Sequence, residues 1–142
     1  MHVNEFPDLD RQLASFPVDV VFGHLGYVPT NEGLSTAGFK AMLRLLKDGK
    51  AWVKLTAPYR LTLSEMPYPD VDATARMLVE QVAERLLWGS DWPHTFIKTG
   101  MPNDGDLLNL FAQWVPDEKL RERILVSNPA SLYDSPSAGS RS

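Results

Sequence analysis

Short apolar segments that alternate with helical patterns constrain the fold of this chain more than any other feature. Segments 18–22 (VDVVF), 51–56 (AWVKLT) and 86–89 (LLWG) are apolar and bounded by turn or helix signals, as buried strands are. Residues 1–6 are a weaker fourth candidate for a strand. Because helical patterns fill the intervals, the sequence predicts an α/β protein with a parallel sheet.

Helical spacing of apolar residues predicts five helices and a final short turn that begins at Asn128. The predicted helices cover residues 9–16, 38–47, 71–85, 106–115 and 117–126. Pro116 separates the last two helices, because proline cannot continue a helix. Residues 135–142 (SPSAGSRS) are small and polar, so we expect one domain over residues 1–134 and a disordered tail.

Two architectures fit this order of elements. One is an open doubly wound sheet, and the other is part of a (β/α)8 barrel. A full barrel typically needs about 250 residues and eight strands. A chain of 142 residues with four strands would therefore form about half of one. No phosphate-binding glycine loop is present, which leaves a doubly wound small-molecule binder without support.

Composition excludes several classes of function. The formal net charge of −4 argues against a nucleic-acid partner, because phosphate binding needs basic patches. The absence of cysteine excludes disulfides and thiolate metal sites. No apolar run approaches the roughly 20 residues of a membrane span. The first ten residues lack the basic and apolar regions of a signal peptide, so we expect a cytoplasmic protein without membrane contacts.

Ionisable side chains follow each of the three stronger strands. His24 follows the first, Tyr59 and Arg60 follow the second, and Asp91 and His94 follow the third. Active sites of parallel α/β folds lie at the carboxyl ends of the strands. The sequence therefore predicts that these side chains gather at one edge of the sheet.

Each of these residues also has a structural interpretation. His24 is a metal ligand, a general acid or base, or a buried histidine bonded to a loop. Asp91 is a general base or a metal ligand, or else a helix cap or turn residue. Arg60 is a clamp for a substrate carboxylate or one half of a salt bridge. His94 is a substrate-binding or a structural loop histidine. The residues alone leave these alternatives open.

Four segments resemble the amidohydrolase-related family of metal-dependent hydrolases, and most closely its 2-pyrone-4,6-dicarboxylate lactonase branch. They are 21–26 (VFGHLG), 52–60 (WVKLTAPYR), 87–94 (LWGSDWPH) and 128–133 (NPASLY). The resemblance implies the C-terminal half, about strands five to eight, of a (β/α)8 TIM barrel. It also implies a hydrolase that opens a lactone or a related cyclic ester of a carboxylate substrate.

The resemblance also implies a role for each candidate. Asp91 matches the aspartate after strand eight, which handles the proton of the hydrolytic water. His24 matches the catalytic histidine after strand six, and Arg60 matches an arginine for the substrate carboxylate, assisted by Tyr59 and His94. Some members hold one divalent metal, and zinc or manganese bound to His24 and Asp91 is the expectation if this chain binds one. The lactonase branch works without a metal.

Strands one to four of the barrel, with the paired His-x-His motif of the family, have no counterpart here. Residues such as Val20 and Val53, or their neighbours, would then face an absent half of the barrel. We therefore expect a homo-oligomer or an N-terminal half-barrel partner. A catalytically incomplete half-barrel and a decarboxylase of the same superfamily are the alternatives to the lactonase.

Overall fold

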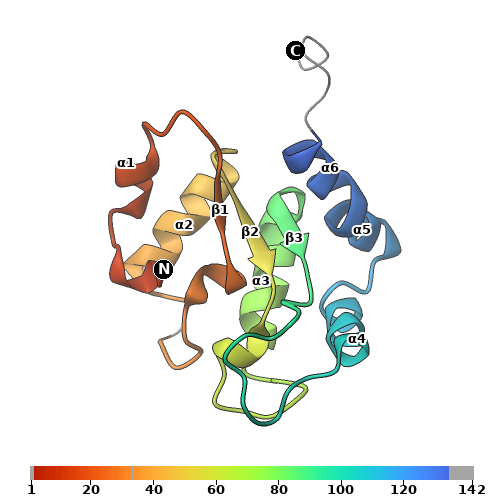
Figure 1. The fold of residues 1–142 in the computed structure, drawn as a ribbon. Coiled ribbons are helices and arrows are strands. Elements are labelled where there is room, and N and C mark those ends of the chain that lie inside the picture. The colour runs from red at the N-terminus through yellow and green to blue at the C-terminus, as the bar shows by residue number, and fades with distance from the viewer. Residues whose placement is uncertain (1, 33, 135–142) are drawn as a thin grey trace.

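The computed structural model describes residues 2–32 and 34–134, and these residues form the α/β arrangement that the sequence predicts (Figure 1). A three-stranded parallel sheet has the order β1–β2–β3, with β1 at Val20–Phe22, β2 at Ala51–Leu55 and β3 at Leu86–Trp88. All three stronger strand predictions are confirmed. The predicted tail, 135–142, lies outside the described residues.

The predicted fourth strand at residues 1–6 is wrong in its described part. Val3–Glu5 form a 3₁₀ helix, η1, and the side chain of Val3 is fully buried. Helix α2 lies against this turn, and a Cβ atom added to Gly38 would lie 1.7 Å from the Val3 carbonyl oxygen. The segment therefore packs against a helix and does not pair with the sheet.

The described residues contain six α-helices. They are α1 (Leu9–Leu13), α2 (Ala37–Lys47), α3 (Asp72–Val82), α4 (Asp104–Trp114), α5 (Glu118–Glu122) and α6 (Asn128–Tyr133). Side-chain caps begin three of them, because Thr36, Asn103 and Asp117 each accept a hydrogen bond from a backbone N–H of the first turn. The helices expected from the apolar spacing are thus present, several of them shorter than predicted.

The segment that begins at Asn128, predicted as a short turn, is helical. Residues Arg123–Ser127 form a π-helical segment, η5, and Asn128 keeps helical backbone angles, so α5 and α6 form one continuous helix. Pro129 has no N–H to donate to the preceding turn. A π-bulge is a common way for a helix to accommodate such an interruption.

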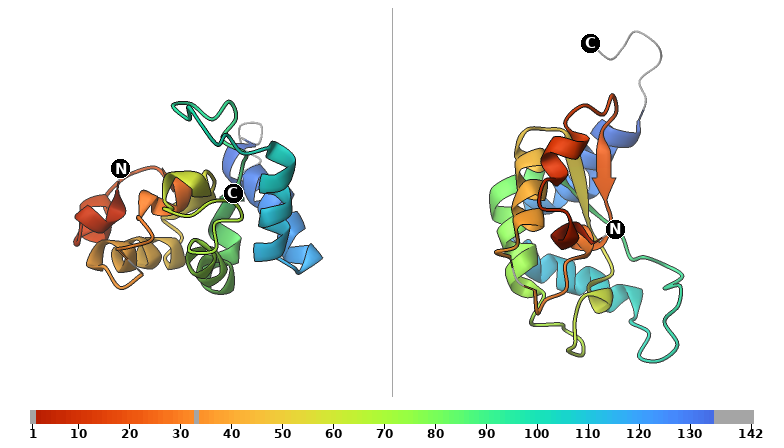
Figure 2. Two further views of the ribbon diagram at one scale, coloured as in Figure 1. Left: turned by 90° about the horizontal axis from the view of Figure 1, so that it is seen from below. Right: turned by 90° about the vertical axis from the view of Figure 1, so that its left-hand side faces the viewer.

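The sheet is covered on one face and open on the other. Helices α2 and α3 lie behind the strands in Figure 1, and the side view in Figure 2 shows the same layering. Val53 points into the core formed with these helices and is fully buried, whereas Val21 is 37% exposed. The neighbours of Val20 and Val53, such as Val21 and Lys54, therefore occupy the open face.

Among the described residues, no helix is both long and apolar enough to cross a membrane. The carboxyl ends of all three strands point to the same end of the molecule, the lower end in Figure 1. The loops that follow the strands begin there, and they carry every candidate site residue.

Candidate active site

The structure brings all five sequence-predicted site residues into one cluster around Asp91. The Tyr59 hydroxyl donates to Asp91 Oδ2 at 2.7 Å, and the Arg60 Nε–H donates to the same oxygen at 3.0 Å. Arg60 Nη2 lies 3.0 Å from that oxygen as part of the ion pair. His24 Nε2 lies 4.0 Å from the other oxygen, Oδ1. His94 joins the cluster through Tyr59, with 2.8 Å between its Nδ1 and the hydroxyl oxygen.

Left-handed backbone conformations at the strand ends position the cluster. His24, Asp91 and His94 have φ angles of 46°, 63° and 57°, and Ala57, which precedes the Tyr59 turn, has a φ of 48°. Such angles are uncommon for residues other than glycine and cost about 1–3 kcal/mol each. Strained residues of this kind concentrate at functional sites, and here they coincide with the ionisable side chains.

Thr56 fixes the orientation of the His24 ring. Its Oγ1 lies 2.8 Å from His24 Nδ1 and also accepts the His24 backbone N–H at 3.3 Å. Nε2 is therefore the ring nitrogen that faces Asp91. Burial lowers the pKa of His24, and this effect outweighs the opposing attraction of the Asp91 carboxylate. A lowered pKa favours a neutral imidazole at neutral pH.

Asp91 is held in its ionised form. Burial alone would raise its pKa, but hydrogen bonds from Tyr59 and Arg60, with the nearby positive charges, lower it below its ordinary value. The pKa of Tyr59 is raised in turn, by burial first and then by its hydrogen bond to Asp91. Tyr59 consequently keeps its proton and remains a donor to the carboxylate.

Arg60 and His94 are placed differently from the simple substrate-binding roles expected for them. Arg60 Nε donates to Asp91 Oδ2, and Nη2 lies within ion-pair distance of the same oxygen. Nη2 donates its hydrogen bond to the Thr95 carbonyl at 2.7 Å. His94 is only 4% exposed, and its Nε2 lies 2.8 Å from Asp104 Oδ1. Both side chains therefore hold other parts of the site in place.

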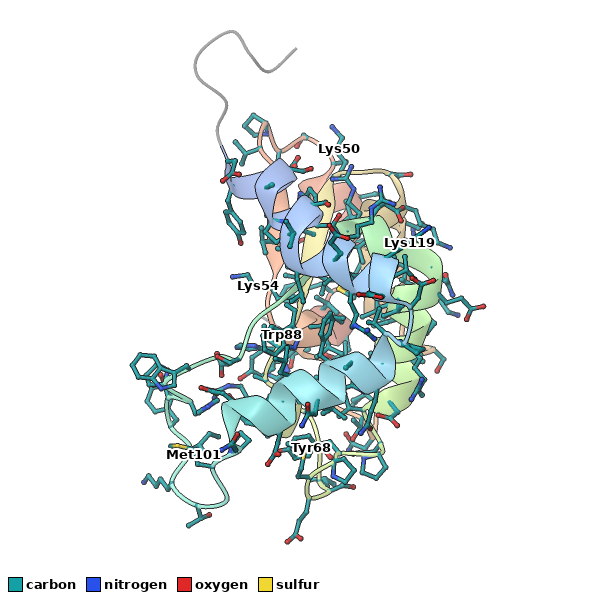
Figure 3. All side chains as sticks on the ribbon, turned by 90° about the vertical axis from the view of Figure 1, so that its right-hand side faces the viewer. Lys50, Lys54, Tyr68, Trp88, Met101 and Lys119 are labelled. Atoms are coloured by element: carbon teal, nitrogen blue, oxygen red, sulfur yellow. The ribbon has the colours of Figure 1, made fainter. Side chains whose placement is uncertain are left out.

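A pocket of about 280 Å³ opens beside Asp91 and reveals a residue that sequence reasoning missed. Its lining includes His24, Thr56, Asp91 and Lys54. Lys54 is half-buried and forms no hydrogen bond or ion pair with the described residues, and in Figure 3 it extends from the sheet away from α3. The period-two pattern of the strand could have indicated it, because Lys54 and Thr56 lie on the same face.

The described residues do not fit the metal site that the sequence led us to consider. Residues 2–32 and 34–134 contain no group of three or more histidine, aspartate or glutamate side chains placed to hold a metal ion. His24 and Asp91 supply two candidate ligands, whereas a catalytic zinc takes three protein ligands. Asp91 Oδ2 already accepts hydrogen bonds from Tyr59 and Arg60.

The family model for Amidohydrolase matches residues 1–135. The chain belongs to this family, and the resemblance inferred from its motifs is confirmed.

Known proteins similar to this chain include a lactone hydrolase. The 4-sulfomuconolactone hydrolase of Rhizobium radiobacter is 44% identical over 123 residues, which are 85% of this chain and 41% of that enzyme. The crystal structure of an Agrobacterium tumefaciens protein in its apo form is 31% identical with a TM-score of 0.81, covering 96% of this chain and 49% of that protein.

A further solved structure is that of a probable 2-pyrone-4,6-dicarboxylic acid hydrolase from Acinetobacter baumannii with citric acid bound. It is 28% identical with a TM-score of 0.78, and the match covers 93% of this chain and 50% of that protein. The chain thus spans about half the length, or less, of the proteins it matches.

Proposed function

We propose that this chain supplies the acid–base residues of a lactone hydrolase that acts on a carboxylate-bearing substrate, with Asp91 as the general base. In this proposal β1, β2 and β3 correspond to strands six, seven and eight of a (β/α)8 barrel. The observation that carries the proposal is the asymmetry of Asp91. Its Oδ2 accepts hydrogen bonds from Tyr59 and Arg60, whereas Oδ1 faces His24 across 4.0 Å.

That asymmetry assigns the base to a single oxygen. Hydrogen bonds occupy Oδ2, so Oδ1 is the oxygen open to a water molecule beside His24 Nε2. A general base must come within about 2.6–3.2 Å of the proton it takes, either directly or through one water. Because hydrogen bonds keep the pKa of Asp91 low, the carboxylate is ionised and ready to accept that proton at neutral pH.

The reaction then proceeds through a tetrahedral intermediate. As the water oxygen bonds to the lactone carbonyl carbon, Asp91 Oδ1 takes one water proton. In the tautomer that carries its proton on Nε2, His24 donates a hydrogen bond to the developing oxyanion. Collapse of the intermediate breaks the ring carbon–oxygen bond, and Asp91 returns its proton to the leaving oxygen. The product is the open hydroxy acid, or its keto tautomer if the leaving group is an enol.

The cations of the site support an anionic substrate. Arg60 retains Nη1, which forms no hydrogen bond with the described residues, beside the carboxylate that it orients. Lys54 lines the pocket of His24 and Asp91 without a carboxylate partner among the described residues. An anionic substrate group in the same pocket would attract this half-buried ammonium more strongly than it would a fully solvated one, because the effective dielectric constant is lower there. The sulfonated and dicarboxylate lactones in the names of the similar proteins are anions of this kind.

The proposed enzyme also needs further strands. Within the described residues, β1 and β3 each pair with β2 alone, and one face of the sheet is open. Unpaired strand edges favour association. We therefore include in the proposal a second copy of this chain or a separate N-terminal half-barrel as the partner that completes the site.

Asp91→Asn tests the proposal. The chain, alone and mixed with the N-terminal half of a similar lactonase, is assayed for ring opening of a carboxylate-bearing lactone by ultraviolet absorbance. The variant is expected to lose about 10²–10⁴-fold in kcat, because an amide cannot take a proton from water. Asp106→Asn, an exposed aspartate of α4, is the control and is expected to match the unmodified chain.

Near-normal turnover by Asp91→Asn would remove Asp91 from the mechanism. If neither the chain nor its mixture opens the lactone, the chain is a catalytically incomplete fragment in these assemblies. Release of carbon dioxide in place of ring opening would support the decarboxylase alternative.

A further inference from the structure

A chain of hydrogen bonds leads away from Asp91 through side chains that the hydrolysis itself does not use. Asp91 Oδ2 accepts from the Tyr59 hydroxyl at 2.7 Å, and His94 Nδ1 lies 2.8 Å from that hydroxyl oxygen. His94 Nε2 then lies 2.8 Å from Asp104 Oδ1. His94 is 4% exposed, while the Asp104 side chain, in the first turn of α4, is 48% exposed. The four side chains connect the base to the outer surface.

The number of protons in this series of hydrogen bonds determines where each proton lies. Tyr59 has one hydroxyl proton and gives it to Asp91, so the hydroxyl oxygen can only accept from His94. Nδ1 of His94 must therefore carry a proton. Nε2 faces a carboxylate oxygen, which also requires a proton between the two atoms. Both ring nitrogens of His94 are donors, and the Asp104 carboxylate balances the resulting charge in a charge-assisted hydrogen bond.

We propose that His94 is a positioning residue of the site. It is doubly protonated and held by Asp104, and its Nδ1–H donates to the Tyr59 oxygen. The Tyr59 hydroxyl then donates to Asp91 Oδ2, which leaves Oδ1 as the basic oxygen. The consequence for catalysis rests on the proposed lactone hydrolysis, whereas the order of the protons does not. If Tyr59 instead donated to His94, its oxygen would oppose the Asp91 carboxylate at 2.7 Å, and the base would lose a hydrogen bond that holds it in place.

Asp91 and His94 form the two ends of a short turn, and both have left-handed backbone angles, which fits the proposal. The His94 N–H donates to the Asp91 carbonyl at 2.8 Å, so the base and the positioning residue belong to one turn. Arg60 also contacts this segment, because its Nη2 donates to the carbonyl of Thr95, the residue after His94. The charged and titratable groups beside His94 and Tyr59 are Asp91, Arg60, Asp104 and Tyr68. With a cationic His94, the charges alternate in the order Arg60, Asp91, His94, Asp104.

Nuclear magnetic resonance of the ¹⁵N-labelled chain tests the order of the protons without any need for activity. Only three histidines occur, and the His94→Gln variant identifies the signals of His94. At neutral pH we expect both ring nitrogens of His94 to appear protonated. In Asp104→Asn, whose amide can donate to Nε2, we expect Nδ1 alone to keep its proton. Asp106→Asn, with the same change of charge two residues away, should keep both protons.

Kinetics of His94 variants test the consequence for the base, in the assembly that opens the lactone. His94→Leu removes the donor to the Tyr59 oxygen and is expected to lower kcat about tenfold, the effect of losing one hydrogen bond, with KM little changed. His94→Gln, whose side-chain amide can donate to the same oxygen, is expected to recover part of that loss. Asp106→Asn should retain the unmodified kcat.

An unprotonated ring nitrogen on His94 in the unmodified chain would overturn the proposal, as would an unchanged kcat in His94→Leu. If the unmodified assembly hydrolyses no lactone, the proposed function fails by itself, and the nitrogen spectrum still decides the order of the protons.

Discussion

The two oxygens of Asp91 have different surroundings, and this difference defines the chemistry at the residue scale. Two donors, the Tyr59 hydroxyl and the Arg60 Nε–H, converge on Oδ2, whereas Oδ1 faces His24 across 4.0 Å. The hydrogen bonds favour the carboxylate over the carboxylic acid, so they lower the pKa of Asp91 although burial opposes them. Changes to these donors should therefore appear in the pH dependence of the reaction.

Tyr59→Phe removes one of these donors and is expected to move the acid limb of the kcat/KM profile to higher pH. Activity requires ionised Asp91, and losing the hydroxyl raises the pKa of that carboxylate toward its ordinary value. Tyr68→Phe is the matched control, because Tyr68 lies beside Tyr59 but forms no hydrogen bond with Asp91. An acid limb that stays in place, or that moves equally in both variants, would contradict this account.

The same depressed pKa links Asp91 to folding. A carboxyl group whose pKa is lowered in the folded state stabilises the fold above its unfolded pKa, and this contribution is lost as pH falls through the folded pKa. Tyr59→Phe should therefore reduce the difference in free energy of unfolding between neutral and acidic pH, measured by urea titration at each pH.

Lys54→Met is expected to raise KM for a carboxylate-bearing lactone by about tenfold, which corresponds to about 1.4 kcal/mol of binding free energy. A neutral lactone should be unaffected, because the change removes a charge from the pocket and keeps the apolar stem. Lys50→Met, at the residue just before β2 and well separated from Lys54 in Figure 3, is the control. Equal effects of Lys54→Met on both substrates would assign Lys54 to packing.

At the scale of elements, one buried amide joins the C-terminal helix to the sheet. Asn128 Nδ2 donates to the carbonyl oxygens of Ala83 and Leu86, each at 2.8 Å, and its side chain is almost fully buried. The π-helical segment η5 lies immediately before it. The contact lies at the start of β3, the strand that leads to the loop of Asp91.

Asn128→Ala is expected to lower the free energy of unfolding by about 1–3 kcal/mol, because it leaves buried carbonyls without their donor. Ser127→Ala, at the exposed neighbouring position, is the control and should change stability little. Urea unfolding followed by tryptophan fluorescence measures both. Equal stability of the two variants would show that water replaces the amide at no cost.

For the whole molecule, the open face of the sheet is the dominant feature. Val21 is exposed there, and each outer strand has one neighbour among the described residues. Full burial of an exposed aliphatic side chain supplies roughly 1.5–3 kcal/mol, and Val21, at 37% exposure, lacks part of that contribution. Such a contribution is large against the total stability of about 5–15 kcal/mol that is typical of a domain.

We therefore predict that the chain associates with itself or with an N-terminal half-barrel at micromolar concentration, as measured by sedimentation velocity. Val21→Lys should weaken the association, because it places a charge on the open face. Val18→Lys, which is exposed just before β1 and outside the sheet, should not. A folded monomer that opens a lactone by itself would contradict the need for a partner.

The amino-acid sequence by itself determined the three parallel strands, most of the helices, the family and the five residues of the candidate site. Apolar periodicity is a local property of the chain, so it predicts an element without knowledge of its neighbours. It misled at residues 1–6, where the packing of Val3 against Gly38 replaced a strand, and at Asn128, where a π-bulge continued the helix. Both differences depend on contacts with other elements.

Only the tertiary structure decided which atoms of the site meet. His24 and Thr56 are 32 residues apart, as are Tyr59 and Asp91, and their contacts depend on strand register and on left-handed turns that no local pattern specifies. The same geometry made Arg60 a partner of Asp91, buried His94 against Asp104 and turned Lys54 toward the pocket. Hydrogen bonds require distances near 3 Å, and such distances between remote residues are fixed only when the whole chain has packed.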